Sequence, residues 1–237
     1  MQLETLLNDK KMIMNDPERF MREVWKILYQ TPTLRTRLMY RNVPLPAQFT
    51  HLERDFYNGY IQSKREVHPD AAQISIFKIC KDKPIVGVSV IAHELGHMFW
   101  GDNKIPVFWG LIYGFVTLLA GAGLAMAGFK IMGPCVMASA VLLFIPLQMA
   151  HSRFRERRAE RTGVRALLDV LEPHLMTPYV DFWDQIVREE RVQKFSRIRS
   201  IVKKLGVFTM THPTCENRMS LILKEIRRKD PNFYAEP

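Results

Sequence analysis

Residues 105–150 contain a single charged side chain, Lys130, which separates two long apolar segments. The first runs from Ile105 to Phe129 and the second from Ile131 to Ala150. Each is as long as the roughly 20 helical residues that cross a hydrocarbon core. Soluble helices rarely lack charge over such lengths. The pattern therefore predicts a hairpin of two transmembrane helices, and a buried helical hairpin of a soluble protein is the alternative.

The charges beside these segments predict an orientation. A hairpin returns the chain to the side that it left, and an arginine-rich stretch, HSRFRERRAERTGVR, follows the second segment at residues 151–165. Positive charge next to a span marks the cytoplasmic side. We therefore expect an integral membrane protein with two spans in the inner or cytoplasmic membrane, and we expect both flanking parts to be cytoplasmic.

The stretch IAHELGHMFWGD, residues 91–102, precedes the first apolar segment and contains His-Glu-x-x-His. On a helix, residues four apart share a face, so His93 and His97 can direct two imidazoles at one metal ion. Glu94 lies beside that ion and can take a proton from water, which zinc acidifies. The spacing predicts a Zn²⁺ site. Two histidines without a metal remain the alternative.

A catalytic zinc site usually has a third protein ligand and one open position. Glu156 lies on the expected side, where the chain leaves the second apolar segment. Glu160 lies one helical turn later, where its carboxylate can accept a hydrogen bond from a ligand imidazole. Ordinary pairing of both glutamates with nearby arginines is the alternative.

The rest of the chain carries weaker signals. Three cysteines without a C-x-x-C pair argue against a disulfide framework and a thiolate zinc site. The net charge of +10 suits nucleic acid, an anionic membrane face or acidic substrates. THPTCENRM, residues 211–219, contains His212 and Arg218, which by chemistry alone could be a surface residue and an ordinary ion-pair partner.

Near the N-terminus, Asp16-Pro17-Glu18 predicts the start of a helix. Residues 45–64 are expected to form a second helix, and the alternating, partly β-branched stretch at residues 72–79 predicts a short strand.

Taken together, these motifs resemble those of the HtpX-type integral-membrane zinc metallopeptidases, which are HExxH gluzincins related to the CAAX prenyl proteases. HELGHMFWGD is similar to the metal motif of that family, and a membrane hairpin follows it there too. ERRAE, residues 156–160, resembles E-x-x-A-D, and THPTCENR resembles T-H-P-x-x-x-x-R. The weaker segment HPDAAQISIF is similar to an Asn-Ala element and its strand.

The resemblance implies roles for single residues. Glu156 would be the third zinc ligand, His212 would help to stabilise the tetrahedral oxyanion, and Arg218 would brace the acidic residues around the zinc. The strand near residues 74–79 would bind an extended substrate by backbone pairing. Two positions depart from the family pattern: Glu160 replaces Asp, and Asp70 replaces Asn. The two further spans expected before the metal motif are also missing from the sequence.

The predicted fold is mainly α with a small β-sheet: a zincin-like metallopeptidase domain interrupted by the two-helix transmembrane hairpin. The predicted segments are an N-terminal helical part, the first half of the domain, the hairpin and the second half of the domain, at residues 1–60, 61–104, 105–150 and 151–237.

The predicted function is a membrane-embedded zinc endopeptidase that cleaves membrane or misfolded proteins at the cytoplasmic face. Its expected partners are a polypeptide substrate, in particular a membrane protein, and the lipid bilayer. Two alternatives belong to other classes. One is a zinc-stabilised membrane scaffold or adaptor without turnover. The other is nucleic-acid binding by the basic C-terminal half, which the absence of a nucleic-acid motif disfavours, so we expect no nucleic-acid partner.

Overall fold

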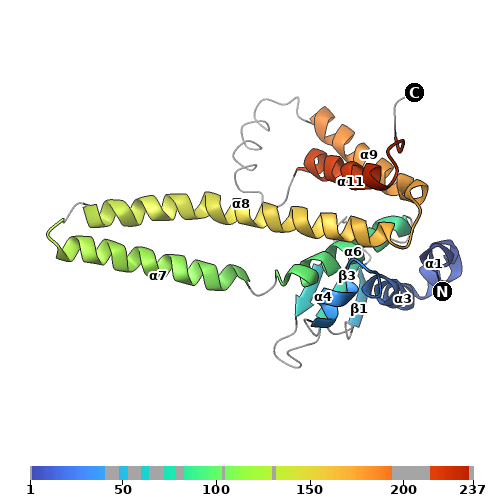
Figure 1. Ribbon diagram of the computed structural model, residues 1–237, viewed down its shortest axis with the longest axis horizontal. Coiled ribbons are helices and arrows are strands. Elements are labelled where there is room, and N and C mark those ends of the chain that lie inside the picture. Colours follow the sequence, from blue (N-terminus) through green and yellow to red (C-terminus); the bar gives the residue numbers. More distant parts are fainter. Residues whose placement is uncertain are drawn as a thin grey trace. The chain divides into compact units, whose positions relative to one another are not determined.

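The computed structural model of the chain is mostly helical (Figure 1). It divides into two units, and the division falls within one long helix. The first unit comprises Met1–Trp100, Arg157–Gln193 and Thr214–Pro237, and the second comprises Gly101–Glu156 and Lys194–Pro213. The structure describes residues 2–40, 48–52, 60–63, 72–77, 83–102, 105–129, 132–193 and 214–234.

The first unit begins with short helices that are joined by capping aspartates. Asp9 accepts a hydrogen bond from the Met12 amide at 2.9 Å, and Asp16 accepts one from the Arg19 amide at 3.1 Å. These bonds satisfy amides that have no partner within a helix. The predicted helix start at Asp16-Pro17-Glu18 is thereby confirmed. The helices are α1 (Leu3–Asn8), α2 (Lys10–Asn15), α3 (Pro17–Tyr29) and α4 (Arg35–Tyr40).

A three-stranded sheet follows, built from β1 (Gln48–Leu52), β2 (Tyr60–Ser63) and β3 (Ala72–Phe77). The strand order is β1-β3-β2, with β1 parallel and β2 antiparallel to β3. The second helix expected at residues 45–64 is wrong, because β1 and β2 occupy part of that range. Their backbone groups find partners on β3, a distant segment that a local sequence pattern does not include.

Helix α6 (Pro84–Trp100) packs closely against the C-terminal part of α8 (Met132–Leu168). A Cβ added at Gly96 would lie 2.3 Å from the Ala159 carbonyl oxygen, and one at Gly163 would lie 2.8 Å from the Ala92 carbonyl oxygen. Both distances are shorter than atoms tolerate, so glycine is required at both positions for this approach. The metal-motif helix is thereby held directly against the helix that carries the two predicted acidic residues.

The remaining helices of the first unit are a 3₁₀ turn η1 (Pro173–Met176), α9 (Thr177–Gln193) and α11 (Cys215–Lys229). Thr214 caps α11 by accepting a bond from the Asn217 amide. Helices α9 and α11 lie side by side (Figure 1). One hydrophobic core joins them to α6 and to the N-terminal helices, with Trp25, Leu95 and Tyr179 among its most buried members.

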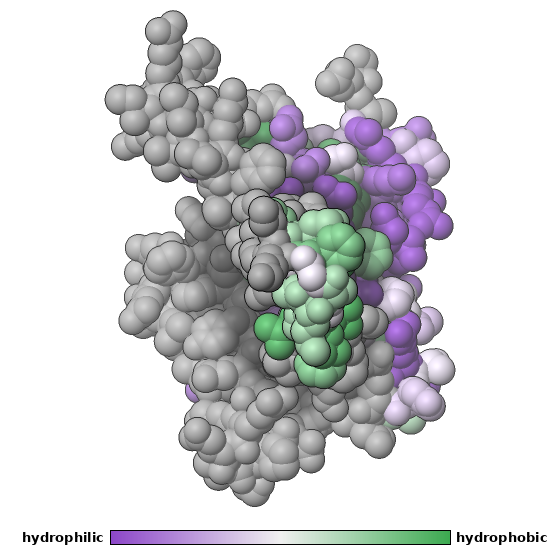
Figure 2. All heavy atoms as spheres, turned by 90° about the vertical axis from the view of Figure 1, so that its left-hand side faces the viewer, coloured by the Kyte–Doolittle hydropathy of each residue, from purple (hydrophilic) through white to green (hydrophobic). Residues whose placement is uncertain are grey.

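The second unit contains α7 (Ile105–Met126) and the first part of α8, which run alongside each other as a hairpin (Figure 1). A Cβ added at Gly133 would lie 2.7 Å from the Gly121 carbonyl oxygen, so the two backbones are close near the turn. Figure 2 shows apolar side chains gathered at this end of the hairpin. Along the hairpin, the exposed large apolar side chains of the described residues include Phe115, Val116, Leu118, Leu119, Met126, Phe129 and Met132.

The predicted transmembrane character of this hairpin is wrong: in the described part of the chain, no helix is long and apolar enough to cross a membrane. Helix α8 continues without a break into the arginine-rich segment, so its apolar part does not form a helix of its own.

This finding corrects two predictions. The first is the fold class, which included a zincin-like domain interrupted by a two-helix transmembrane hairpin. The second is the localisation, two spans in the inner membrane with the site at its cytoplasmic face.

Candidate metal centre

Helix α6 directs His93 and His97 at one point, as the spacing predicts. Their rings lie with centroids 4.8 Å apart and nearly perpendicular, at 86°. The Nε2 atoms of the two rings are 3.1 Å apart. Two nitrogens bound tetrahedrally to zinc at about 2.0–2.1 Å would be about 3.3 Å apart. The separation in the structure is close to that value, so the pair fits a metal ion.

Glu156 completes a group of three potential ligands. One ligand atom each from His93, His97 and Glu156 lie within 4.8 Å of one another. The third donor is the Glu156 carboxylate, which the sequence predicted as the third ligand. Two imidazoles and one carboxylate are a donor set that suits Zn²⁺ and leave a fourth position for water or substrate. The motif's Glu94 is half-buried on the same helix as the two histidines, next to His93 in the chain.

The other nitrogen of His93 faces Glu160. Nδ1 lies 3.0 Å from Glu160 Oε2, and the His93 ring is almost fully buried. When Nδ1 carries the proton and donates it to the carboxylate, Nε2 keeps its lone pair for a metal. Arg218 Nη2 is 3.3 Å from the same Nδ1 but lies closer to Glu160 Oε2, at 2.5 Å. The arrangement therefore favours one tautomer of His93.

Glu160 is a buried carboxylate with several partners. The Arg218 Nε atom donates to Oε2 at 2.5 Å, and the Tyr179 hydroxyl donates to Oε1 at 2.6 Å. Burial alone would raise the pKa of Glu160, but the charge of Arg218 and the hydrogen bonds from His93 and Tyr179 together lower that pKa from 4.5 to about 2. Glu160 is therefore ionised at neutral pH. Its side chain is one methylene longer than the Asp of the E-x-x-A-D pattern, and its carboxylate still reaches His93.

Tyr179 is a site residue that the sequence did not predict. It lies on α9, nineteen residues after Glu160, and only 2% of its surface is exposed. Burial and the Glu160 charge both raise the pKa of its hydroxyl, which therefore stays protonated and can only donate to the carboxylate. No local motif marks this tyrosine, because it reaches the site only when α9 packs beside α8.

The end of α6 is held by a second group of residues. Trp100 donates from its indole nitrogen to Thr162 Oγ1 at 3.0 Å. The guanidinium groups of Arg37 and Arg158 lie 4.4 Å and 4.9 Å from the centre of the Trp100 ring. Such cation–π contacts stabilise the tryptophan beyond its burial. Helix α6 is therefore fixed at the end nearest to His97.

Just after α6, the fully buried Asp102 lies 3.5 Å from Arg155 Nε, and Arg155 also donates to the Asp102 carbonyl. Arg155 directly precedes Glu156 on α8. This ion pair belongs to the second unit and positions the turn of α8 on which Glu156 lies.

Two predicted residues, His212 and Asp70, lie outside the described residues. The strand expected to bind substrate is different: β3 is the central strand, and Gln73–Ser75 pair with β1 on one side and with β2 on the other. Because the backbone groups of Ile74 and Ser75 already have partners on both sides, the predicted substrate pairing is wrong at these two residues. Lys78 and Ile79, at the end of the predicted strand, lie outside the described residues.

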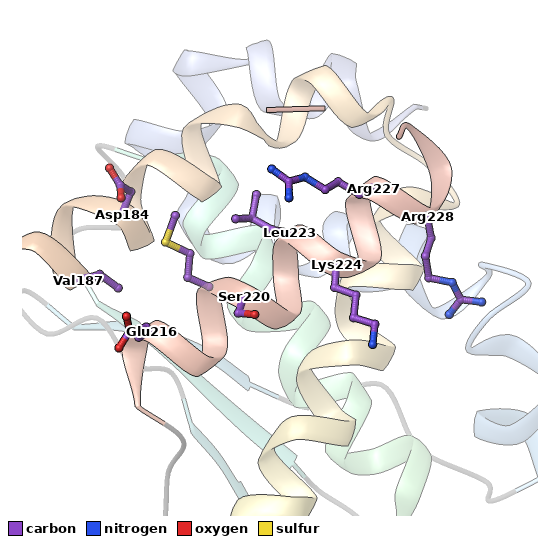
Figure 3. Close-up of a pocket in the computed structure, with 9 residues that line it drawn as sticks. Asp184, Val187, Glu216, Ser220, Leu223, Lys224, Arg227 and Arg228 are labelled. Carbon is purple, nitrogen blue, oxygen red and sulfur yellow. The ribbon is translucent and has the colours of Figure 1, made fainter. Parts of the chain in front are cut away.

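A cavity of about 570 Å³ lies between α9 and α11, away from the metal ligands (Figure 3). Its lining includes Glu216, Ser220 and Leu223 of α11, whereas Arg218 of the same helix points to Glu160. The cavity and the metal centre therefore lie on different faces of α11. The converging ligand atoms, and not the volume of this cavity, indicate where the reactive site lies.

Comparisons with known proteins agree with this geometry. The family model described as Peptidase family M48 matches residues 77–226, well over half of the chain. The matched region contains every candidate ligand together with Glu160 and Arg218. No curated protein and no solved structure matches the chain significantly.

Proposed function

The chain belongs to peptidase family M48, a family of metal-dependent peptidases, and on this premise we propose that it is a zinc endopeptidase. The observation that carries the proposal is the convergence of His93 Nε2, His97 Nε2 and a Glu156 oxygen. The family match supports metallopeptidase chemistry, and the donor set favours zinc over harder metals. The narrower HtpX-type assignment remains a prediction from the sequence motifs.

In this proposal His93, His97 and Glu156 hold the metal, and each surrounding residue has a separate task. When bound, zinc supplies a Lewis acid that polarises the scissile carbonyl and acidifies water. Glu94 accepts a proton from the attacking water and then delivers it to the leaving amine nitrogen. Glu160 holds the proton of His93 at Nδ1, and Arg218 keeps the Glu160 carboxylate charged. His212 is proposed to stabilise the oxyanion.

The substrate is proposed to be an unfolded polypeptide, and casein is a suitable probe. Glu94→Gln should bind one zinc per chain like the wild type but should lose cleavage by at least about a hundredfold, the scale of lost general-base catalysis. His93→Ala should lose both zinc and cleavage. Glu18→Gln, an exposed glutamate on α3, is the matched control and should retain both.

The same experiment separates this proposal from a zinc-stabilised scaffold without turnover. A scaffold needs the metal ligands but has no use for a general base. Cleavage of casein by Glu94→Gln at the wild-type rate, with zinc bound, would therefore contradict the enzymatic proposal.

A further inference from the structure

The two oxygens of Glu160 have different partners. Oε2 faces His93 Nδ1 at 3.0 Å and Arg218 at 2.5 Å, on the side of the metal ligands. Oε1 receives the hydroxyl of Tyr179 at 2.6 Å from the opposite helix, α9. Both side chains of that second bond are almost completely buried, Glu160 at 3% and Tyr179 at 2% exposure. Water therefore has little access to compete for this hydrogen bond.

A carboxylate at the end of a glutamate can rotate about its last bond, since terminal torsions of this kind are broad. Rotation would carry Oε2 away from His93 Nδ1. A donor on Oε1 opposes that rotation because it fixes the second oxygen of the same planar group. Within the described residues, the tyrosine hydroxyl is the donor that occupies this place.

The tyrosine is itself held rigidly. Its ring meets Trp183, one turn later on α9, edge to face, with centroids 6.4 Å apart and an angle of 81°. The guanidinium of Arg218 lies 4.6 Å from the centre of the Trp183 ring. One face of α9 therefore supports both groups that bind Glu160: the hydroxyl directly and the guanidinium through the indole.

We infer that Tyr179 is a positioning residue of the metal centre, which acts through Glu160 on the orientation and tautomer of His93. The inference rests on the proposed function, because it assigns His93 Nε2 to the metal. Tyr179 itself touches neither the metal nor the substrate. Its effect reaches the ligand through a chain of two hydrogen bonds, Tyr179–Glu160 and Glu160–His93.

The test compares Tyr179→Phe with the wild type in the full chain, with zinc alone as the probe and a chromophoric chelator as competitor. Loss of a residue that orients a ligand typically weakens metal affinity 10–100-fold, and Tyr179 is one bond further away, so we expect a loss of about 3–10-fold. In casein cleavage, kcat should fall while KM stays within about twofold. Tyr234→Phe is the matched control: this hydroxyl also donates to a carboxylate, that of Asp181, but at an exposed position.

A double-mutant cycle shows whether Tyr179 acts through Glu160. Glu160→Asp shortens the side chain by one methylene, so the carboxylate no longer reaches both Tyr179 and His93. In that background Tyr179→Phe should change the zinc affinity by less than about twofold. Losses that simply multiply in the double variant would overturn the inference. So would a zinc affinity of Tyr179→Phe within twofold of wild type, or an equal loss in Tyr234→Phe.

A readout in metal-free protein separates this inference from the proposed function. The ¹⁵N shifts of the His93 ring should show the Nδ1–H tautomer in the wild type and a mixture of tautomers in Tyr179→Phe. Failure of the wild type to bind zinc would contradict the proposed function, whereas the ring tautomers would still decide the role of Tyr179. An unchanged His93 tautomer in Tyr179→Phe would overturn that role.

Discussion

Glu160 shows how one residue ties the chemistry of the site to its stability. The carboxylate is buried, yet a guanidinium, an imidazole and a hydroxyl surround it. If the buried charge is removed and its partners stay in place, those partners are left buried and unpaired. This costs more free energy of unfolding than the ion pair itself contributes. Glu160 is thus a residue whose replacement should alter the folding and the metal affinity together.

The first prediction concerns pH and the free energy of unfolding of the metal-free protein. The pKa of Glu160 is about 2 when folded and about 4.5 when unfolded, so ionisation contributes about 3 kcal/mol above pH 4.5. Because the folded pKa is the lower one, this contribution is lost as the pH falls from about 4.5 toward 2. Urea unfolding between pH 6 and pH 3 should show this loss in the wild type.

Glu160→Gln is the comparison for that measurement, because it has no carboxylate to protonate at this position. The difference in stability between wild type and Glu160→Gln should shrink as the pH falls. A difference that stays constant from pH 6 to pH 3 would show that the carboxylate is not held charged by its neighbours.

At the residue scale, the sequence predicted the metal ligands and the general base better than it predicted the residues that hold them in place. His93, Glu94 and His97 were predicted because helical spacing alone brings them together. Glu156 and Glu160 were predicted from one more assumption, that their helix lies beside the first. Tyr179 and Trp183 could not be predicted, since their place depends on how α9 packs, and no short motif encodes that packing.

At the scale of elements, the site depends on how closely α6 approaches α8. Ala92 and Gly96 on one helix meet Ala159 and Gly163 on the other. These small residues are four apart on both helices, one position before His93 and His97 and one position before Glu160. The packing surface and the ligand surface therefore lie side by side along the same two helices.

The second prediction tests this packing. Gly96→Ala would place a methyl group 2.3 Å from the Ala159 carbonyl oxygen, and the helices would have to separate. We expect a loss of about 2–3 kcal/mol of unfolding free energy, the scale of overpacking a tight core. Zinc affinity should fall at least about tenfold, because the carboxylates move away from the histidines. Thermal unfolding and chelator competition measure both effects.

Gly114→Ala on α7 is the control for that substitution, because an added Cβ there meets nothing within 4 Å. Alanine in an exposed helix should be neutral or stabilise by up to about 1 kcal/mol. Equal effects of Gly96→Ala and Gly114→Ala would contradict the close approach of α6 and α8.

The small residues of this crossing were visible in the sequence as Ala92-x-x-x-Gly96 and Ala159-x-x-x-Gly163. A four-residue spacing of small residues does not by itself indicate which helix it packs against, so the crossing is not predicted from it. The strands β1 and β2 were missed for another reason. Each is short, and each exists because β3 supplies its backbone partners.

At the scale of the whole molecule, the N-terminal helices belong to the same core as the metal-motif helix. Trp25 and Leu28 of α3 are buried in one cluster with Ile91 and Leu95 of α6. The buried faces of these helices place α1–α4 within the first unit.

The third prediction follows from this shared core. Trp25→Ala removes a fully buried aromatic side chain and should cost about 3–5 kcal/mol of unfolding free energy. It should also weaken zinc binding, since α3 supports α6. Tyr40→Ala, at 87% exposure, should have little effect on either property. A folded Trp25→Ala protein with wild-type stability and zinc affinity would show that the N-terminal helices are independent of the site.

Zinc K-edge X-ray absorption of the wild-type chain loaded with one equivalent of zinc tests the central claim most directly. Ligation by His93, His97 and Glu156 predicts a first shell of nitrogen and oxygen alone, at about 2.0–2.2 Å, with the scattering pattern of two imidazoles. Glu156→Gln should change that shell, and Glu216→Gln, an exposed control on α11, should not. A sulfur ligand at about 2.3 Å, or a shell without imidazole, would contradict the account.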